Sequence, residues 1–267
     1  MQSGRLIKKA PLVGAFFVLG VWLSPVSADG CQPPANTTLI KVRHVQDGDT
    51  IVLTDDTRLR LIGINTPELG HDKRPAQPLS IRARDRVRQL LFQSGFLAQA
   101  LVGKQPKDKH KRQLTHLWLT DGRNLTAVLL EAGLGWHVVI PPNMRFKNCY
   151  AAAESSARQD RKGVWKENGY YNRPAAGLSL KDTGFQHVKG RIIRVNHGGG
   201  ATWINLEGRF AIRIPDNSRQ WFTQMPDSSW IGRELEVRGW AYQVRGELRV
   251  TVEHPAMLEL TSNAPDP

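Results

Sequence analysis

The sequence has only two cysteines, Cys31 and Cys149, and they lie too far apart to form a zinc site. It contains no CxxC pair, no HExxH spacing among its eight histidines, no GxSxG turn and no Walker loop. The chain therefore carries no signature of a zinc protease, a serine hydrolase or a P-loop nucleotidase.

Acidic residues are also scarce, because 24 Asp and Glu face 37 Lys and Arg, which gives a formal charge of +13. Only three of the positive residues, Arg5, Lys8 and Lys9, lie in the first 28 positions. A strongly basic chain commonly binds a polyanion, since Lys and Arg contacts to phosphates release condensed counterions. The charge predicts a nucleic acid or an anionic surface as partner, but it indicates no reaction.

Long hydrophobic runs are missing except near the N-terminus, where residues 11–23 follow the three basic residues and precede a Val-Ser-Ala sequence. This arrangement is typical of a cleavable secretory signal, which we place at residues 1–28. The run is shorter than the roughly 20 residues that span a bilayer. We expect an exported protein, periplasmic or secreted, with no membrane insertion after cleavage; an uncleaved signal anchor is the alternative.

In an oxidising compartment the two cysteines favour one disulfide, between Cys31 and Cys149. Such a bond would tie the mature N-terminus to the later part of the first domain. Two unpaired thiols are the alternative, because the sequence does not give the Cα separation that a disulfide requires.

The first half of the chain alternates short β-rich runs with turns and then changes to helical periodicity. Apolar positions in 80–92 recur on one helix face with arginines on the other. A further strand pair is expected around the Asp121-Gly122 turn. The expected strands cover 39–45, 50–55 and 57–64, and the expected helices cover 80–92, 124–135 and 146–161, the last ending at Gly163.

The second half alternates again after a stretch with little periodicity, and its five strands in about 70 residues predict a small barrel of the oligonucleotide-binding (OB) kind. The two halves share an architecture in this interpretation. The predicted organisation is a signal at 1–28, an N-terminal segment at 29–37, a first domain at 38–170, a linker at 171–184, an OB-like domain at 185–262 and a tail at 263–267.

Three short motifs bring together residue types that phosphodiester cleavage requires. The first is Asp47-Gly48-Asp49-Thr50, the second runs from Arg60 to Glu68 as RLIGINTPE, and the third is DKHKR, which ends at Arg112. Each motif alone is typical of an ordinary turn, a surface strand or a solvated loop. Together they supply carboxylates for a cation or a water molecule and guanidinium groups for phosphate.

In order and spacing the three motifs resemble the staphylococcal nuclease family. Eight positions separate Arg60 from Glu68, and 44 separate Glu68 from Arg112, as in that family. The similarity covers residues 38–167. It implies a mainly β fold of the α+β type: a five-stranded OB-type barrel with three helices, followed here by the second small OB-like barrel.

The resemblance implies a divalent cation, Ca²⁺, held by Asp49, by the backbone carbonyl of Thr66 and by Asn65. Hard oxygen ligands suit that ion. The most familiar member of the family has an aspartate in place of Asn65, so the amide keeps an oxygen ligand but removes a negative charge.

The resemblance further implies that Glu68 acts as general base or orients the attacking water. Arg60 and Arg112 would bind the phosphate oxygens and stabilise charge in the transition state. The expected activity is metal-dependent hydrolysis of DNA and RNA by a sugar-nonspecific endonuclease.

Two further hypotheses remain from the sequence. A catalytically weak nucleic-acid-binding protein with a decayed metal site is the first, because of Asn65. A two-barrel scaffold that binds an anionic envelope component is the second. No protein partner can be inferred.

Substrate-binding residues are expected in the basic loop around Arg112, namely Lys109, His110 and Lys111, which would contact phosphates without reading sequence. His110 stands where the familiar member has a tyrosine, and Val139 replaces another tyrosine. In the second domain, aromatic residues alternate with arginines, an arrangement that can stack the bases of a single strand or can belong to a core. The expected basic loop also includes Lys104 and Lys107.

Overall fold

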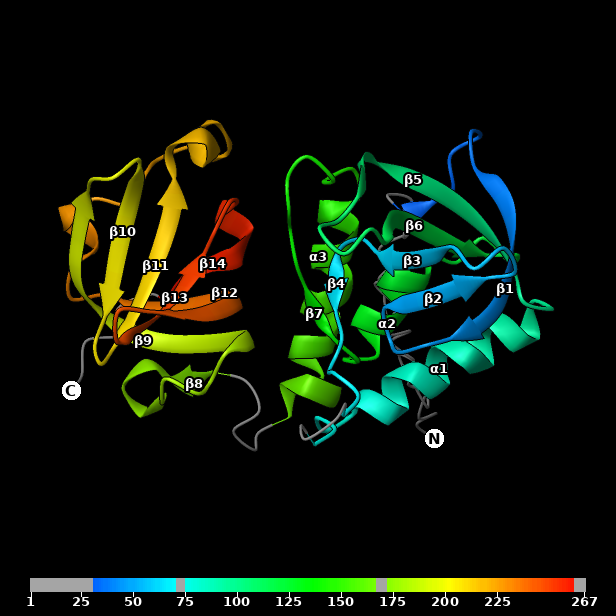
Figure 1. The fold of residues 1–267 in the computed structure, drawn as a ribbon, viewed down its shortest axis with the longest axis horizontal. Helices are drawn as coiled ribbons and strands as arrows, with labels where there is room; N and C mark the ends of the chain where they lie inside the picture. The colour runs from blue at the N-terminus through cyan, green and yellow to red at the C-terminus, as the bar shows by residue number, and fades with distance from the viewer. Residues whose placement is uncertain (1–30, 71–74, 167–171, 262–267) are drawn as a thin grey trace, which may run out of the picture.

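The computed structural model describes residues 31–70, 75–166 and 172–261. The predicted signal at 1–28 and tail at 263–267 lie outside the described residues. Two β-barrels lie side by side, with the helices gathered around the first (Figure 1). Within the described ranges, no helix is long and apolar enough to cross a membrane.

The first barrel is closed by five strands in the order β1-β2-β3-β6-β5. Neighbouring strands are antiparallel except β3 and β6, which run parallel. Alternating or continuous burial along the strands places their apolar side chains inside. The strands are β1 (Thr38–Val45), β2 (Thr50–Leu53), β3 (Arg58–Leu61), β5 (Leu97–Lys107) and β6 (Gln113–Leu119).

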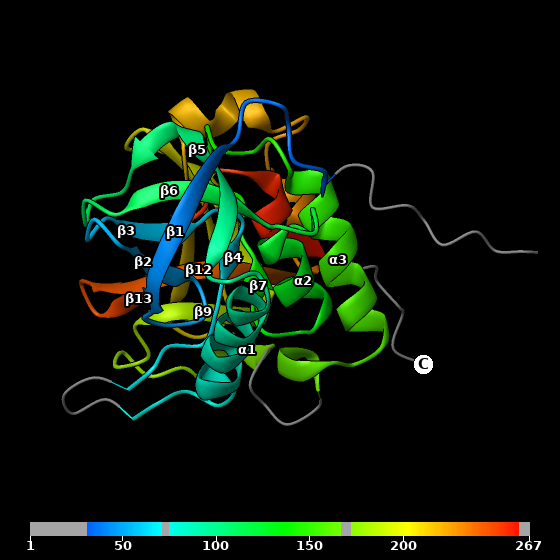
Figure 2. The ribbon, with the colours of Figure 1, turned by 90° about the vertical axis from the view of Figure 1, so that its right-hand side faces the viewer.

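The three predicted helices are confirmed, and Figure 2 shows α1 below the first barrel with α2 and α3 at its side. Helix α1 buries one face at three- and four-residue spacing, including Ala83, Val87 and Leu91. Helix α2 begins at an N-cap, since Asn124 Oδ1 accepts a hydrogen bond from Ala127 N at 3.1 Å. The helices are α1 (Ser80–Gln93), α2 (Leu125–Glu131) and α3 (Lys147–Gln159).

A short two-stranded sheet follows the end of β3, and its first strand carries Ile64 and Asn65 of the RLIGINTPE motif. Strand β4 (Ile64–Asn65) pairs with β7 (Trp136–His137). The turn before β4 needs Gly63, whose φ of +88° lies in the left-handed region and whose α-carbon faces the Tyr150 ring. This turn directs Asn65 back toward the barrel end.

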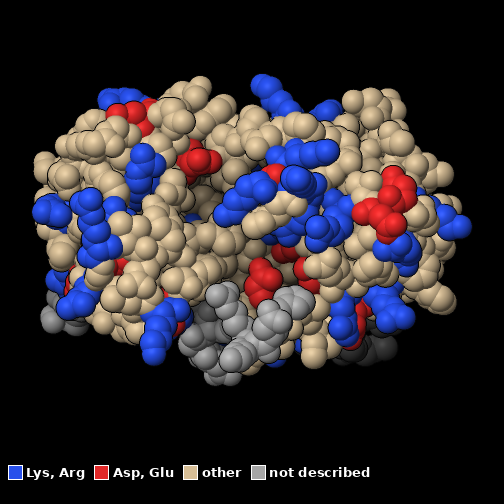
Figure 3. All heavy atoms as spheres, viewed as in Figure 1, with Lys and Arg blue, Asp and Glu red and all other residues tan. Residues whose placement is uncertain are grey.

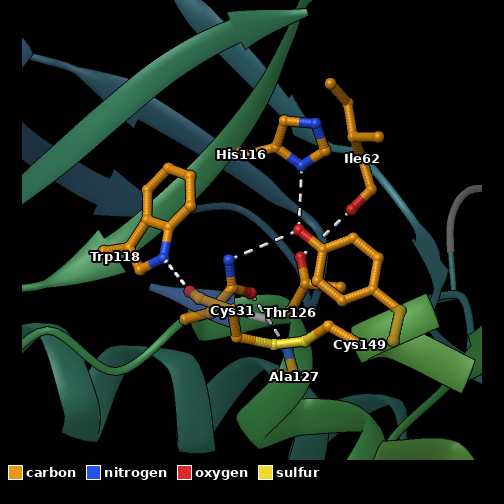
Figure 4. The surroundings of a disulfide bond; sticks show 9 residues. Cys31, Ile62, His116, Trp118, Thr126, Ala127 and Cys149 are labelled. Carbon is orange, nitrogen blue, oxygen red and sulfur yellow. Dashed lines mark hydrogen bonds between the residues drawn. A yellow bond between two sulfur atoms is a disulfide. The ribbon is translucent and has the colours of Figure 1, made fainter. Parts of the chain in front are cut away.

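A disulfide joins Cys31 to Cys149 in α3, with a Cα separation of 5.7 Å (Figure 4). Beside it, His116 Nδ1 lies 2.8 Å from the Tyr150 hydroxyl, and Asn124 Nδ2 donates to the same hydroxyl at 3.4 Å. Burial, followed by the positive charge of Arg145, lowers the pKa of His116 from 6.5 to about 4. His116 is therefore neutral in the folded protein at neutral pH.

Acid is expected to destabilise the protein through this histidine. Between pH 6.5 and about 4 the unfolded chain binds a proton that the folded chain excludes, so the free energy of unfolding falls as pH drops. The slope approaches about 1.4 kcal/mol per pH unit for this one group. Urea unfolding at several pH values measures it, and His116→Gln should flatten the decline; an identical slope in both proteins would contradict this assignment.

The second barrel repeats the topology of the first. Its strands close in the order β9-β10-β11-β13-β12, with β12 pairing back to β9 and with β11 and β13 parallel. The predicted OB-like barrel is confirmed. The strands are β9 (Gly184–His197), β10 (Ala201–Leu206), β11 (Phe210–Pro215), β12 (Glu234–Val244) and β13 (Glu247–Thr251), with β14 (Leu258–Leu260) added beside β12.

Part of the stretch expected as a linker, 171–184, packs on the second barrel. Strand β8 (Arg173–Pro174) pairs with β9, and Ala175 is buried in the core of that barrel.

Lys104 and Lys107, which the sequence places in a basic loop, lie instead in β5, because this strand extends further than its polar residues suggest. Of the strand pair expected around Asp121-Gly122, the strand before the turn is present as β6, but no second strand forms after it, where a single bridge joins Trp118 to Asn124.

The two barrels are held together by ion pairs that join α3 to β12 and β14. Arg238 Nη1 lies 2.7 and 2.6 Å from the two carboxylate oxygens of Glu154, which also accepts from His137 N at 2.6 Å. Arg158 lies 3.2 Å from Glu236 and 2.7 Å from Glu259. Because Glu154 is 4% exposed, the pair with Arg238 is shielded from solvent.

Candidate active site

A pocket of about 530 Å³ opens between the barrels at the end of the first one. Figure 3 shows a hollow there, with lysine and arginine side chains along one rim and acidic side chains below. The sequence-predicted residues that line the pocket are Asp49, Arg60, Asn65, Glu68, Lys109, His110 and Arg112. The fold therefore brings the three motifs, which are far apart in the sequence, together in one pocket.

Asp49 is buried and is held by hydrogen bonds at the start of β2. Its Oδ2 accepts from Thr66 N at 2.8 Å and from Thr66 Oγ1 at 3.1 Å, and its Oδ1 accepts from Thr50 Oγ1 at 3.2 Å. A Cβ at Gly48 would lie 2.7 Å from Thr66 Oγ1 and 2.8 Å from Ala83 Cβ. Glycine is required here because the chain of the DGDT motif passes so close to Thr66.

Arg60 lies 7% exposed at the floor of the pocket, and its guanidinium is anchored to the turn that follows β3. Nη1 donates to Leu61 O at 2.8 Å and to Ile64 O at 2.7 Å. Nη2 donates to Asn65 Oδ1 at 3.1 Å and lies 3.2 Å from Asp49 Oδ2. These contacts fix the orientation of the guanidinium and balance the buried charge of Asp49.

Arg112 is half-buried at the opposite wall and is oriented by Asp108. Its Nε and Nη2 each lie 2.8 Å from Asp108 Oδ2, and its Nη1 donates to Thr50 Oγ1 at 3.3 Å. Burial alone would raise the pKa of Asp108, but the hydrogen bonds from Arg112 lower it below the usual value. Thr50 thus lies between Asp49 and Arg112 and contacts both.

Glu68 is exposed at the rim of the pocket, directly after the buried Pro67. Its backbone is fixed to the segment before α1, because Glu68 N donates to Gln77 Oε1 at 2.7 Å and Gln77 N donates to Glu68 O at 2.9 Å. The carboxylate therefore stands at the solvent side of the cluster formed by Asp49 and Arg60.

Asp47 is a pocket residue that the sequence analysis did not single out, although it begins the DGDT motif. Burial, and then the negative charge of Asp49, raise its pKa to about 6. Asp47 Oδ1 also accepts from Asp49 N at 2.9 Å. The close spacing of the two aspartates in the sequence could have identified Asp47 as a site residue.

Asp108 was likewise overlooked, although its four-residue spacing to Arg112 could have identified it as the partner of that arginine.

The donors around Asp49 fit a hard divalent cation. The candidate ligands are all oxygens: the carboxylates of Asp47 and Asp49 and the amide oxygen of Asn65, which line the pocket, and the carbonyl of Thr66, which accepts from Asn65 Nδ2 at 3.3 Å. Burial, and then repulsion by Asp49, raise the pKa of Asp47, and a bound cation would offset both effects by stabilising the charged carboxylate. Among the described residues, no group of three His, Cys, Asp or Glu side chains gathers as a metal site, so any cation here depends on amide and carbonyl oxygens.

Comparisons with known proteins agree with this arrangement. The family model described as "Staphylococcal nuclease homologue" matches residues 58–167. The thermonuclease of Staphylococcus intermedius is 30% identical over 128 residues, which cover 47% of this chain and 74% of that protein. The thermonuclease of Staphylococcus hyicus is 31% identical over 135 residues, covering 49% and 78%. The chain belongs to the staphylococcal nuclease family.

A third relative is the SPbeta prophage-derived endonuclease YokF of Bacillus subtilis, 30% identical over 128 residues, which cover 46% of this chain and 43% of that protein. The match to the staphylococcal nuclease family model ends at residue 167, so the second barrel lies beyond it. The residues that the second barrel contributes to the pocket therefore lie outside the region that matches the family model.

Of the residues expected to contact substrate in this staphylococcal nuclease domain, two lie in the pocket and one does not. Lys109 and His110 line it, whereas Lys111 is exposed in the turn of the loop with a φ of +63°. Asp108 Oδ1 shapes this turn by accepting from the backbone N of His110 and of Arg112, both at 2.9 Å. Val139 also lines the pocket.

Proposed function

We propose that the protein is an exported, sugar-nonspecific endonuclease that hydrolyses phosphodiester bonds of DNA and RNA with a divalent cation, Ca²⁺. One observation carries the proposal: Asp49, Arg60, Glu68 and Arg112, scattered over 64 positions of the chain, line one pocket. Relatives named thermonuclease and endonuclease support the same activity. The basic composition suits a polyanionic substrate.

In this mechanism Glu68 receives the proton of the attacking water. Its exposed position at the rim lets water reach the carboxylate. The oxygens of Asp47, Asp49, Asn65 and Thr66 would hold a divalent cation, which would neutralise charge at the phosphoryl group. Thr66 N and Arg60 Nη2 both contact Asp49 Oδ2 and fix the position of this carboxylate.

Both arginines place positive charge beside the phosphoryl oxygens in this proposal, and Arg112 also donates hydrogen bonds to them. A guanidinium has five N–H donors, and the contacts of Arg112 to Asp108 and Thr50 occupy three of its nitrogens but leave one N–H on each Nη. These outer donors form the fork that a phosphate requires. Arg60 is preoriented by its two carbonyl partners, so it contributes positive charge without reorganisation.

Digestion of plasmid DNA tests the proposal. The purified mature protein is expected to degrade plasmid and single-stranded RNA when Ca²⁺ is added, and an excess of chelator is expected to abolish the reaction. Restoration by Ca²⁺ but not by Na⁺ of equal ionic strength separates a cation requirement from a salt effect. Undiminished cleavage in chelator would overturn the metal dependence.

Asn65 supports one competing function, a nucleic-acid-binding protein that has lost turnover. Its neutral amide contributes no charge to the cation site, and its Oδ1 accepts from Arg60 at 3.1 Å. Binding of DNA without hydrolysis under a series of divalent ions would favour this second function. Asn65→Asp should then restore or strengthen cation-dependent cleavage, because a second carboxylate tightens the site.

A further inference from the structure

The second barrel supplies one wall of the pocket, and the side chain of a tryptophan lies in this wall. Trp240 in β12 lines the pocket together with Gly239, Thr251 and Glu253. Its side chain is 39% exposed, which is high for a tryptophan. Among the described residues that line the pocket, no other is a phenylalanine, tyrosine or tryptophan.

Docking of the barrels places Trp240 at this position. Alternate residues of β12 point outward, and Glu236 and Arg238 use this face to form the ion pairs with α3. Trp240 is the next outward residue. Its ring packs edge to face on Phe185 at 5.2 Å between centroids, and Phe185 packs on Trp136 of the first domain at 5.2 Å.

A nucleobase fits this wall better than a phosphate. Glu253 lines the same part of the pocket, and its charge repels a phosphate but not a neutral base. On the first-barrel side, Val138, Val139 and Ile140 present aliphatic surface. An exposed indole stacks any base on its face without reading sequence.

The outer face of the second barrel continues from Trp240 as a track of polar, basic and aromatic residues. Thr251, which lines the pocket, is the cross-strand partner of Arg213, and Arg213 is the partner of Trp203. The Arg249 guanidinium lies 4.9 Å above the Trp203 ring. Alternating cations and rings on adjacent strands suit the backbone and bases of a single strand.

We propose that this face binds a single-stranded segment of the substrate, with an unstacked base on Trp240 and the strand continuing past Arg213 toward Trp203. The inference rests on the proposed function, because that function places the scissile phosphate in the adjoining pocket. A paired base keeps its own stacking neighbours and cannot use Trp240. The face therefore favours single strands over duplexes.

Fluorescence anisotropy with labelled oligothymidylate of about 16 nucleotides tests the proposal, in chelator so that no cleavage is expected. Trp240→Ala in the full mature chain is expected to raise Kd about tenfold for this single strand and to leave duplex binding nearly unchanged. Phe92→Ala, which removes an exposed ring of α1 outside the pocket, is the matched control and should bind as the wild type does. An equal loss on single strand and duplex, or no loss on either, overturns the proposal.

Arg213→Ala provides a second test that does not touch the contact between Trp240 and Phe185. It is expected to lower the slope of log K against log salt for the single strand by about 0.7, the value for one phosphate contact. An unchanged slope overturns the track beyond the pocket. Wild-type protein that binds the single strand as expected but cleaves nothing with any divalent ion refutes the proposed function alone. Wild-type protein that cleaves, together with a Trp240→Ala variant that binds the single strand as tightly as the wild type, refutes this inference alone.

Discussion

Glutamine in place of Glu68 is expected to lower kcat on plasmid DNA by about two orders of magnitude or more. The amide keeps the size and hydrogen-bonding groups of the side chain but cannot accept a proton from water at neutral pH. Because Glu68 is exposed and its loop is fixed through backbone contacts with Gln77, the substitution should leave the free energy of unfolding unchanged. Initial rates at saturating DNA and urea unfolding of both proteins measure these quantities.

Glu131→Gln is the matched control, since Glu131 is an exposed glutamate at the end of α2 and does not line the pocket. We expect its kcat to equal that of the wild type. A Glu68→Gln enzyme that retains wild-type kcat would remove Glu68 from the mechanism, and an equal loss in the control would point to a general effect of lost negative charge.

Removal of the Arg112 side chain is expected to have an effect of similar size, a loss of about two orders of magnitude in kcat/KM for Arg112→Ala. The alanine enzyme lacks both outer N–H donors. It also leaves the half-buried Asp108 without its cation, and that carboxylate then repels the phosphate. Arg112→Lys should recover part of the loss, because an ammonium keeps the charge but not the fork.

Arg123→Ala is a control of the same local design. Arg123 Nε donates to Asp121 Oδ2 at 2.8 Å in an exposed turn, as Arg112 Nε does to Asp108, but Arg123 does not line the pocket. Wild-type kcat/KM is expected for this variant. If both alanine variants lost activity equally, the effect of Arg112 would be attributable to net charge rather than to its place in the pocket.

Local patterns predicted much of the fold. The four-residue recurrence of apolar positions in α1 and the glycine after α3 mark those elements without any tertiary information. Strand β5 was missed because its second half carries Lys104, Pro106 and Lys107, and this composition is typical of a loop. The strand is maintained there by pairing with β6, where Lys107 lies opposite Gln113.

The site was predictable only in part. The order and spacing of the three motifs, through the family resemblance, brought Asp49, Arg60 and Glu68 together, and the structure places them in one pocket. The second wall was not predictable from spacing. Trp240 reaches the pocket because Arg238 pairs with Glu154, 84 positions away, and a pairing between two domains leaves no periodic trace in the sequence.

Strand β12 fixes the distance between the ion pairs that join the two barrels and the indole ring that lines the pocket. Its outward residues perform two tasks at two-residue intervals, first docking through Glu236 and Arg238 and then presenting Trp240, while Gly239 faces inward against Val250. An insertion of one residue between Arg238 and Trp240 would turn the indole into the barrel interior. The segment between Arg238 and Trp240 can therefore gain residues only in steps of two if the indole is to keep facing the pocket.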